Sequence, residues 1–267
     1  MRGLLASPLG FLIGVSLGAL GGGGSILAVP ALVYVAGQSA QEATATSLLV
    51  VGLVSLGGLV PHWRAGRVRA GAGLVFGLAG VAGSLLGSAL NESADPDALL
   101  LAFSGLMLVA AAAMVRRTRR SAPARAGGPA GGQDAVQTAL RVDAATVLKV
   151  LLAGSVVGLL TGFFGVGGGF VIVPALVLAL GFSMPEAVGT SLLVIAINSA
   201  VALAARLDAG TLDWGVALPF TAAGLLGVTF GSHLAGRIDA AVLVRWFAAL
   251  LVAVACYTGL RSALALW

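Results

Sequence analysis

The sequence has 267 residues, of which 59% are hydrophobic and 9% are charged, and its formal net charge is +5. Soluble domains carry about a quarter of their residues as charged side chains, so this chain cannot present an ordinary water-facing surface. The apolar content excludes a disordered chain, and the single cysteine, Cys256, excludes a disulfide-stapled module. The apolar stretches are continuous and do not alternate with polar residues, which predicts an all-α polytopic membrane protein.

Each half of the chain contains one long apolar stretch interrupted by glycines, followed by three stretches of ordinary membrane-spanning length. In chain order we expect these at residues 3–36, 41–61, 71–90 and 98–115, and then at 149–180, 185–205, 214–234 and 241–262. An unbroken helix over 3–36 would be about 51 Å long, well beyond the hydrocarbon core of a bilayer. The glycines are therefore expected to break each long stretch into a helical hairpin of two legs.

The two halves resemble each other along almost their whole length. Residues 14–114 align without gaps with residues 158–258, and about a third of the aligned positions are identical. We therefore expect two homologous transmembrane repeats, at 1–115 and 149–267. The segment between them, 116–148, is rich in Arg, Gly and Pro and is expected to be a flexible linker.

The positions of the basic residues predict the topology. Arginines gather at 64–69 and in the linker, and short basic loops mark the cytoplasmic side of a membrane. In the second half the basic residues lie one loop later, around Arg237, which predicts inverted repeats with both termini outside and a cytoplasmic linker. We expect a multi-pass protein of the inner (plasma) membrane. Because topology explains the basic residues, we expect no nucleic-acid partner.

The glycine runs at 21–24 and 165–169 are the strongest candidates for a binding site. Bare backbone N–H groups in glycine-rich breaks, followed by a helix N-terminus, favour a negatively charged ligand. In inverted repeats two such breaks would meet near the membrane midplane, as in secondary transporters. The alternative is that the glycines only permit close helix packing, the role that we assign to three other glycine pairs: Gly14/Gly18, Gly83/Gly87 and Gly227/Gly231. The substrate-binding candidates in the two breaks are Gly22, Gly23, Gly24, Ser25, Gly167, Gly168 and Gly169.

Several polar residues inside the apolar stretches are further candidates. The hydroxyls of two equivalent pairs either face the breaks or bond back to their own helix; these are Thr46, Ser47, Thr190 and Ser191. Asn198 has no polar equivalent in the first half, since Val54 stands there, and it is also a substrate-binding candidate. His62 and Arg206 stand at equivalent span ends and are expected at the membrane interface.

Two equivalent carboxylates, Glu42 and Glu186, begin the stretches that follow the hairpins. A carboxylate within the membrane is a candidate for proton coupling. Each glutamate also stands three residues after a serine, Ser39 or Ser183, which is the spacing of a helix capping box. Both interpretations remain open at this point.

The second half reads Gly162-Phe163-Phe164-Gly165-Val166-Gly167-Gly168-Gly169, then VPAL at 173–176 and PEAVGTSL at 185–192. With their partial copies in the first half, these motifs resemble the sulfite exporter TauE/SafE family over nearly the whole chain except the linker. The first half departs from the pattern at Leu20, Gly22, Gln41 and Ala45, so the two halves of a site would be unequal. The resemblance implies movement of small sulfur-containing anions, such as sulfite or organosulfonates, usually outward.

Together these features predict a secondary transporter that exports small anions by alternating access around the two broken helices. The alternative is a membrane subunit or a channel-like permease for another small anion. We find no nucleotide-binding P-loop and expect no enzymatic activity, cofactor or metal. The expected partners are a small anionic substrate and the lipid bilayer, with a homodimer as a further option.

Overall fold

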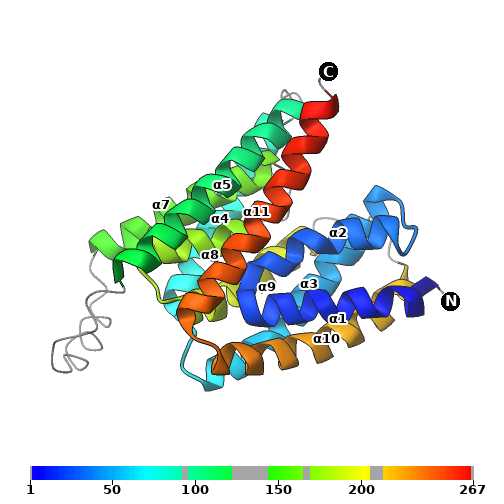
Figure 1. Cartoon of the computed structure of the whole chain (residues 1–267), viewed down its shortest axis with the longest axis horizontal. Helices are drawn as coiled ribbons and strands as arrows, with labels where there is room; N and C mark the ends of the chain where they lie inside the picture. Colours follow the sequence, from blue (N-terminus) through cyan, green and yellow to red (C-terminus); the bar gives the residue numbers. More distant parts are fainter. Residues whose placement is uncertain (1, 92–95, 122–143, 165–168, 205–212, 266–267) are drawn as a thin grey trace.

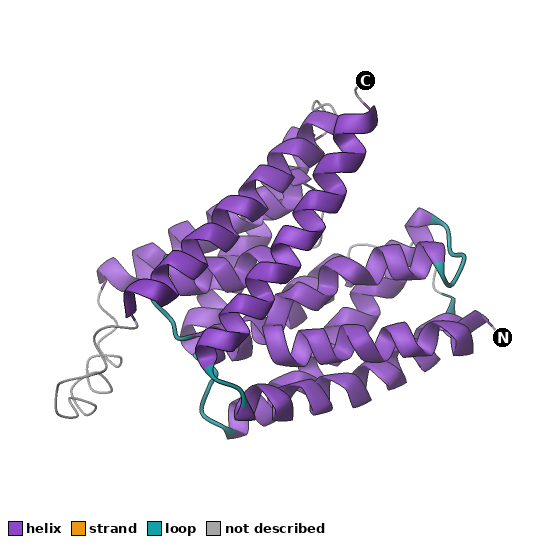
Figure 2. Ribbon diagram, in the orientation of Figure 1, coloured by secondary structure: helices purple, strands orange, loops and turns teal. Residues whose placement is uncertain are grey.

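The computed structural model describes residues 2–91, 96–121, 144–164, 169–204 and 213–265, and all of their regular secondary structure is helical (Figure 2). In chain order the helices are α1 (Arg2–Leu20), the 3₁₀ helix η1 (Gly21–Gly24), α2 (Ser25–Tyr34), α3 (Ala40–Arg64), α4 (Ala70–Asn91), α5 (Pro96–Ser121), α7 (Ala144–Phe164), α8 (Gly169–Leu178), α9 (Met184–Ala204), α10 (Trp214–Arg237) and α11 (Ala240–Ala265). Among the described residues eight segments are long and apolar enough to cross a membrane. The chain is therefore an all-α polytopic membrane protein, as predicted.

The helix bounds follow the expected stretches closely, with one difference around the linker. Helix α5 continues to Ser121 and α7 begins at Ala144, so both ends of the segment expected to be a linker, 116–148, are helical. Arginines are good helix formers and extend α5 beyond its apolar stretch without a break. The rest of the linker, 122–143, lies outside the described residues.

The first glycine run breaks the long apolar stretch as predicted. Gly21 has a φ of +72°, a left-handed conformation that favours glycine, and the chain reverses there. A Cβ atom on Gly24 would lie 2.6 Å from the carbonyl oxygen of Ile13 and 2.9 Å from the backbone nitrogen of Leu17. Residues that would be far apart in a straight helix are therefore neighbours, and Figure 1 shows α2 returning beside α1. The segment forms a helical hairpin.

The closest helix pairs join the two halves of the chain: α1 with α10, α4 with α7, α3 with α9, and α5 with α11. Along α1 and α10, Gly14 faces Gly224 and Gly18 faces Val228, so the two helices run parallel. Added Cβ atoms would overlap backbone atoms of the facing helix at six glycines: Gly14, Gly18, Gly83, Gly87, Gly227 and Gly231. The prediction that these three pairs serve close packing is confirmed.

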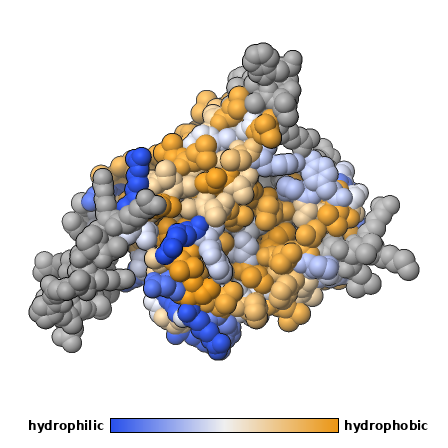
Figure 3. Space-filling model, in the orientation of Figure 1, coloured by the Kyte–Doolittle hydropathy of each residue, from blue (hydrophilic) through white to orange (hydrophobic). Residues whose placement is uncertain are grey.

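The chain ends and the middle of the chain lie on opposite sides of the bundle. Figure 1 places the start of α1 and the end of α11 on one side, and the end of α5 and the start of α7 on the other. Large apolar side chains, including Leu85, Leu226 and Leu260, are exposed around the bundle. On the face drawn in Figure 3 hydrophobic residues cover most of the described surface. Such a surface requires lipid around it.

We predict opposite effects for two Gly→Ala substitutions in helices. A methyl group on Gly227 would overlap the carbonyl of Phe11, so Gly227→Ala should lower the free energy of unfolding by about 1–3 kcal/mol. Gly105 has no atom within 4 Å of an added Cβ, so Gly105→Ala should be neutral or stabilise by up to about 1 kcal/mol. Thermal denaturation of the purified protein in one detergent measures both. Equal midpoints for the two variants would contradict the packing described.

Candidate functional site

The first glycine break touches the start of α8 in the second half. A Cβ atom on Gly22 would overlap the carbonyl group of Gly169, and a Cβ atom on Gly169 would lie 3.2 Å from the Cα atom of Gly22. Both glycines are buried. The two backbones therefore meet directly, at a separation that leaves no room for a side chain on Gly22 and little room for one on Gly169.

Two serines complete the surroundings of this contact. The Ser25 hydroxyl donates to the Gly22 carbonyl at 2.7 Å and lies against Gly169. The Ser191 hydroxyl donates to the Val188 carbonyl at 2.8 Å, and a Cβ atom on Gly21 would lie 2.5 Å from its oxygen. Each hydroxyl hydrogen is thus used on the backbone and must rotate before it can donate to a ligand.

The second leg of the first hairpin begins with the four glycines that precede Ser25. Gly21–Gly24 form the 3₁₀ turn η1, and the Ser25 amide donates to the Gly22 carbonyl. Free amides at the start of this leg must therefore come from the glycines. All four glycines of the turn, Gly23 and Gly24 included, are buried. In the second half, Gly169 is the first residue of α8, whereas Gly167 and Gly168 lie outside the described residues.

The first break lies toward one end of α10. Gly18 lies opposite Val228 and Ser232, and α10 ends at Arg237. At 3.6 residues per turn, the first break is within about two turns of that end. It lies nearer the basic end of α10 than its middle.

The other predicted hydroxyls are buried, and each has a different environment. Ser47 donates to the Thr44 carbonyl at 2.8 Å, so it bonds back to its own helix. The Thr190 hydroxyl oxygen accepts from the Arg69 backbone amide at 3.1 Å. The Thr46 hydroxyl is buried and has no partner among the described residues. Of the four predicted hydroxyls on α3 and α9, that of Ser191 is the one with a described contact to the first break, beside Gly21.

Asn198 lies about two turns beyond Ser191 on α9. Its Nδ2 atom is 3.9 Å from the Cβ position of Gly80 on α4, and its buried Oδ1 atom has no partner among the described residues. The described contacts therefore place it at the crossing of α4 and α9 and do not join it to Gly22 and Gly169.

The two glutamates both have capping geometry. Glu42 accepts from the backbone amide and hydroxyl of Ser39, each at 2.9 Å, while the Ser39 hydroxyl accepts from the Glu42 amide. Glu186 accepts from the amide and hydroxyl of Ser183 at 3.1 and 2.8 Å. Glu186 also forms an ion pair with Arg69 at 2.5 Å, which links α9 to the turn before α4. These contacts leave proton coupling untested.

His62 is buried inside the helix bundle, which its position at a span end did not indicate. Its side chain is 2% exposed, and Nε2 lies 3.1 Å from the Gly18 carbonyl oxygen on α1. The close approach of α1 to α3 buries the imidazole, which a pattern of span ends cannot reveal. Arg206, its equivalent, lies outside the described residues.

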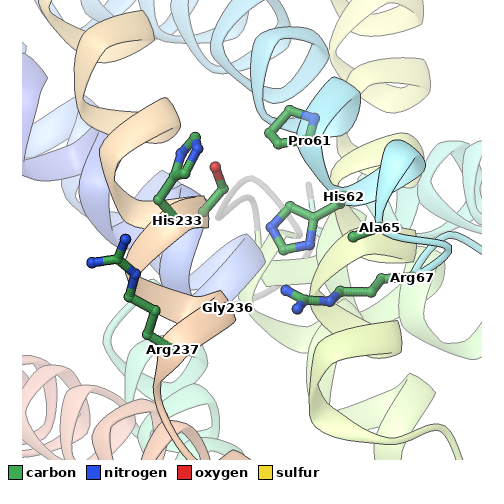
Figure 4. A pocket seen from close by; sticks show the side chains of 8 residues that line it. Pro61, His62, Ala65, Arg67, His233, Gly236 and Arg237 are labelled. Atoms are coloured by element: carbon green, nitrogen blue, oxygen red, sulfur yellow. The ribbon is translucent and has the colours of Figure 1, made fainter.

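Sequence reasoning missed a cavity of about 270 Å³ beside His62. It is lined by Pro61, His62, Ala65, Arg67, Ser232, His233, Gly236 and Arg237. Figure 4 shows His62 and Arg67 on one wall and His233 and Arg237 on the other. The only signal in the sequence was that both turns, after α3 and after α10, carry arginines. In the described part of the chain, no group of three His, Cys, Asp or Glu residues could hold a metal ion.

Comparisons with known proteins agree on one family. A probable membrane transporter protein of Xylella fastidiosa (strain 9a5c) is 36% identical over 256 residues, which cover 95% of this chain and 93% of the relative. The probable membrane transporter protein YunE of Bacillus subtilis (strain 168) is 25% identical over 97% of both chains. No solved structure matches the chain.

The profile of the family described as sulfite exporter TauE/SafE matches residues 6–258. The chain therefore belongs to the sulfite exporter TauE/SafE family, and like its relatives it is a membrane transporter and not an enzyme.

Proposed function

We propose that this transporter is a secondary exporter of small anions that works by alternating access around its two broken helices. The observation that carries the proposal is the buried backbone contact between Gly22 and Gly169. It brings the N-terminal end of the η1–α2 leg beside the N-terminus of α8. Helix N-termini carry about half a positive charge each, so the junction favours an anion over a cation.

The contact also implies a movement. Because the two backbones touch, a solute can bind between them only after they separate. A contact that must open and close is what alternating access requires at its centre. Ser25 and Ser191, whose hydroxyls now donate to backbone carbonyls, are free to rotate toward the space that opens.

The pattern of helix contacts supports two homologous repeats. Gly14 of α1 meets Gly224 of α10, and the equivalent residues of the other half, Gly158 of α7 and Gly80 of α4, meet in the same way. Each pair is related to the other by the offset between the aligned halves. An approximate two-fold relation between the halves would make the α1–α10 contact and the α7–α4 contact equivalent.

The directions of the helices support an inverted arrangement. Helices α1 and α7 are equivalents, and Figure 1 shows them starting on opposite sides of the bundle. The ends of α3 and α10, with Arg67 and Arg237, lie together around one cavity. We assign this basic side to the cytoplasm and the protein to the inner membrane.

Sulfite and organosulfonates are the substrates that we propose. The family description supports a sulfur oxyanion, and the absence of acidic residues among the described contacts of Gly22 and Gly169 is compatible with one. An inside-negative membrane potential alone would favour the exit of an anion. Energy then comes from the membrane, in agreement with a sequence that has no P-loop.

Counterflow in proteoliposomes tests the proposal. Wild-type protein should exchange labelled sulfite against unlabelled sulfite with saturation. Gly22→Ala should reduce exchange by about tenfold or more, because its methyl group overlaps Gly169 and prevents closure. Gly105→Ala, which meets no neighbouring atom, is the matched control and should keep the wild-type rate. The proposal is wrong if the wild-type protein gives no saturable exchange with sulfite or organosulfonates, or if Gly22→Ala exchanges as fast as the control.

The two glutamates remain candidates for proton coupling, and their contacts favour the capping role. Glutamine preserves a capping box but cannot ionise. From the capping geometry we expect Glu42→Gln and Glu186→Gln to keep the pH dependence of exchange unchanged. The exchange rate of each variant, measured between about pH 5.5 and about pH 8, distinguishes a capping role from proton coupling. Loss of the pH dependence in either variant would identify that carboxylate as a proton carrier.

A further inference from the structure

The cavity between the ends of α3 and α10 carries positive charge on two walls. Arg67 and His62 face Arg237 and His233 across it (Figure 4). None of the described residues that line it is acidic. Its volume of about 270 Å³ equals roughly nine water molecules, enough for a small oxyanion with part of its hydration shell.

The arginines are available to a ligand. In the described part of the chain, the side chains of Arg67 and Arg237 make no hydrogen bond or ion pair, whereas Arg69 is neutralised by Glu186. The guanidinium of Arg67 extends to α10, where its Nη2 atom lies 3.6 Å from the Cβ position of Gly236. The missing side chain at Gly236 gives the guanidinium room to reach the opposite wall.

The hydrogen bond of His62 determines how its ring can meet an anion. The Gly18 carbonyl can only accept, so Nε2 must carry the hydrogen. In a neutral ring Nδ1 then carries a lone pair. Nδ1 is buried and has no partner among the described residues. Protonation of the ring would therefore act on an anion in the cavity through its positive charge.

Among the described residues around His62, none places an unpaired carboxylate on the cavity side. Helix α10 contributes His233 and Arg237, the turn after α3 contributes Arg67 and Arg69, and α1 contributes only the Gly18 carbonyl. Helix α9 contributes Glu186, which is already paired with Arg69. An anion in the cavity would therefore be the counter-charge that stabilises a protonated His62.

We propose that this cavity is an anion-binding access site, in which a small sulfate-like oxyanion binds to Arg67 and Arg237 together with a proton on His62. The proposal rests on the proposed function and deepens it. His62 holds the carbonyl of Gly18, three residues before the break at Gly21, so the loaded cavity lies next to the first hairpin. Binding of the anion beside the broken helix and protonation of His62 would then favour each other.

Sulfate is the best probe, because it remains a dianion between about pH 5.5 and about pH 8, so a pH effect reports the protein. Calorimetric titration of the purified full-length chain should give tighter sulfate binding at the lower pH. Arg67→Gln and Arg237→Gln should each weaken binding by about tenfold or more. Arg64→Gln removes an equal charge from an exposed position at the same helix end outside the cavity, and it should bind as wild type.

Two histidine variants test the proton. His62→Gln should bind sulfate with a smaller change in affinity between the two pH values than His233→Gln shows. If His62→Gln does not fold, the pH dependence of the wild-type protein still decides: affinity that is equal at both pH values overturns the linkage. Equal sulfate affinity in wild type, Arg67→Gln and Arg237→Gln overturns the site itself.

The outcome is separable from that of the proposed function. If the wild-type protein exchanges sulfite while the arginine variants bind sulfate normally, the access site is wrong and the transporter mechanism stands. If sulfate binds at the cavity but the protein moves no sulfur oxyanion, the site stands and the proposed substrate is wrong.

Discussion

The direct contact of two polypeptide backbones, at Gly22 and Gly169, is the constraint from which the rest of the architecture follows. A side chain at Gly22 would force the segments apart. The chain can reach this contact only by breaking α1 at Gly21, where a positive φ reverses its direction. Buried backbone breaks are tolerated in a membrane only where protein or water surrounds them, and α8, α9 and α11 enclose this one.

The same constraint ties the two halves of the chain together. Each hairpin is held from outside by a helix of the other half, α1 by α10 and α7 by α4, through glycines that allow the backbones to approach. Positive charge lies at two neighbouring places in the bundle. One is the cavity beside His62, lined by arginines, and the other is the pair of helix N-termini at the short legs η1–α2 and α8.

Most of the fold could be predicted from the sequence, because spans, glycine breaks and glycine packing pairs leave local patterns. Gly14 and Gly18 are an example of such a pattern. The serine–glutamate spacing likewise indicated the hydrogen bonds that cap α3 and α9. The features that the sequence could not provide depend on which helices, distant along the chain, pack together. They are the burial of His62, the pairing of Arg69 with Glu186 and the position of Asn198 at the crossing of α4 and α9. A span-end residue looks interfacial until a second helix covers it.

The central claim is that a small anion binds where the two broken helices meet. Anomalous diffraction from crystals of the protein grown with selenite, a heavier relative of sulfite, tests it most directly. The account predicts a selenium peak within hydrogen-bonding distance of the backbone amides at Gly22–Gly24 or at the start of α8, with the two glycine segments drawn apart. Selenium bound only elsewhere, or an unbroken helix through residues 18–30, would contradict it.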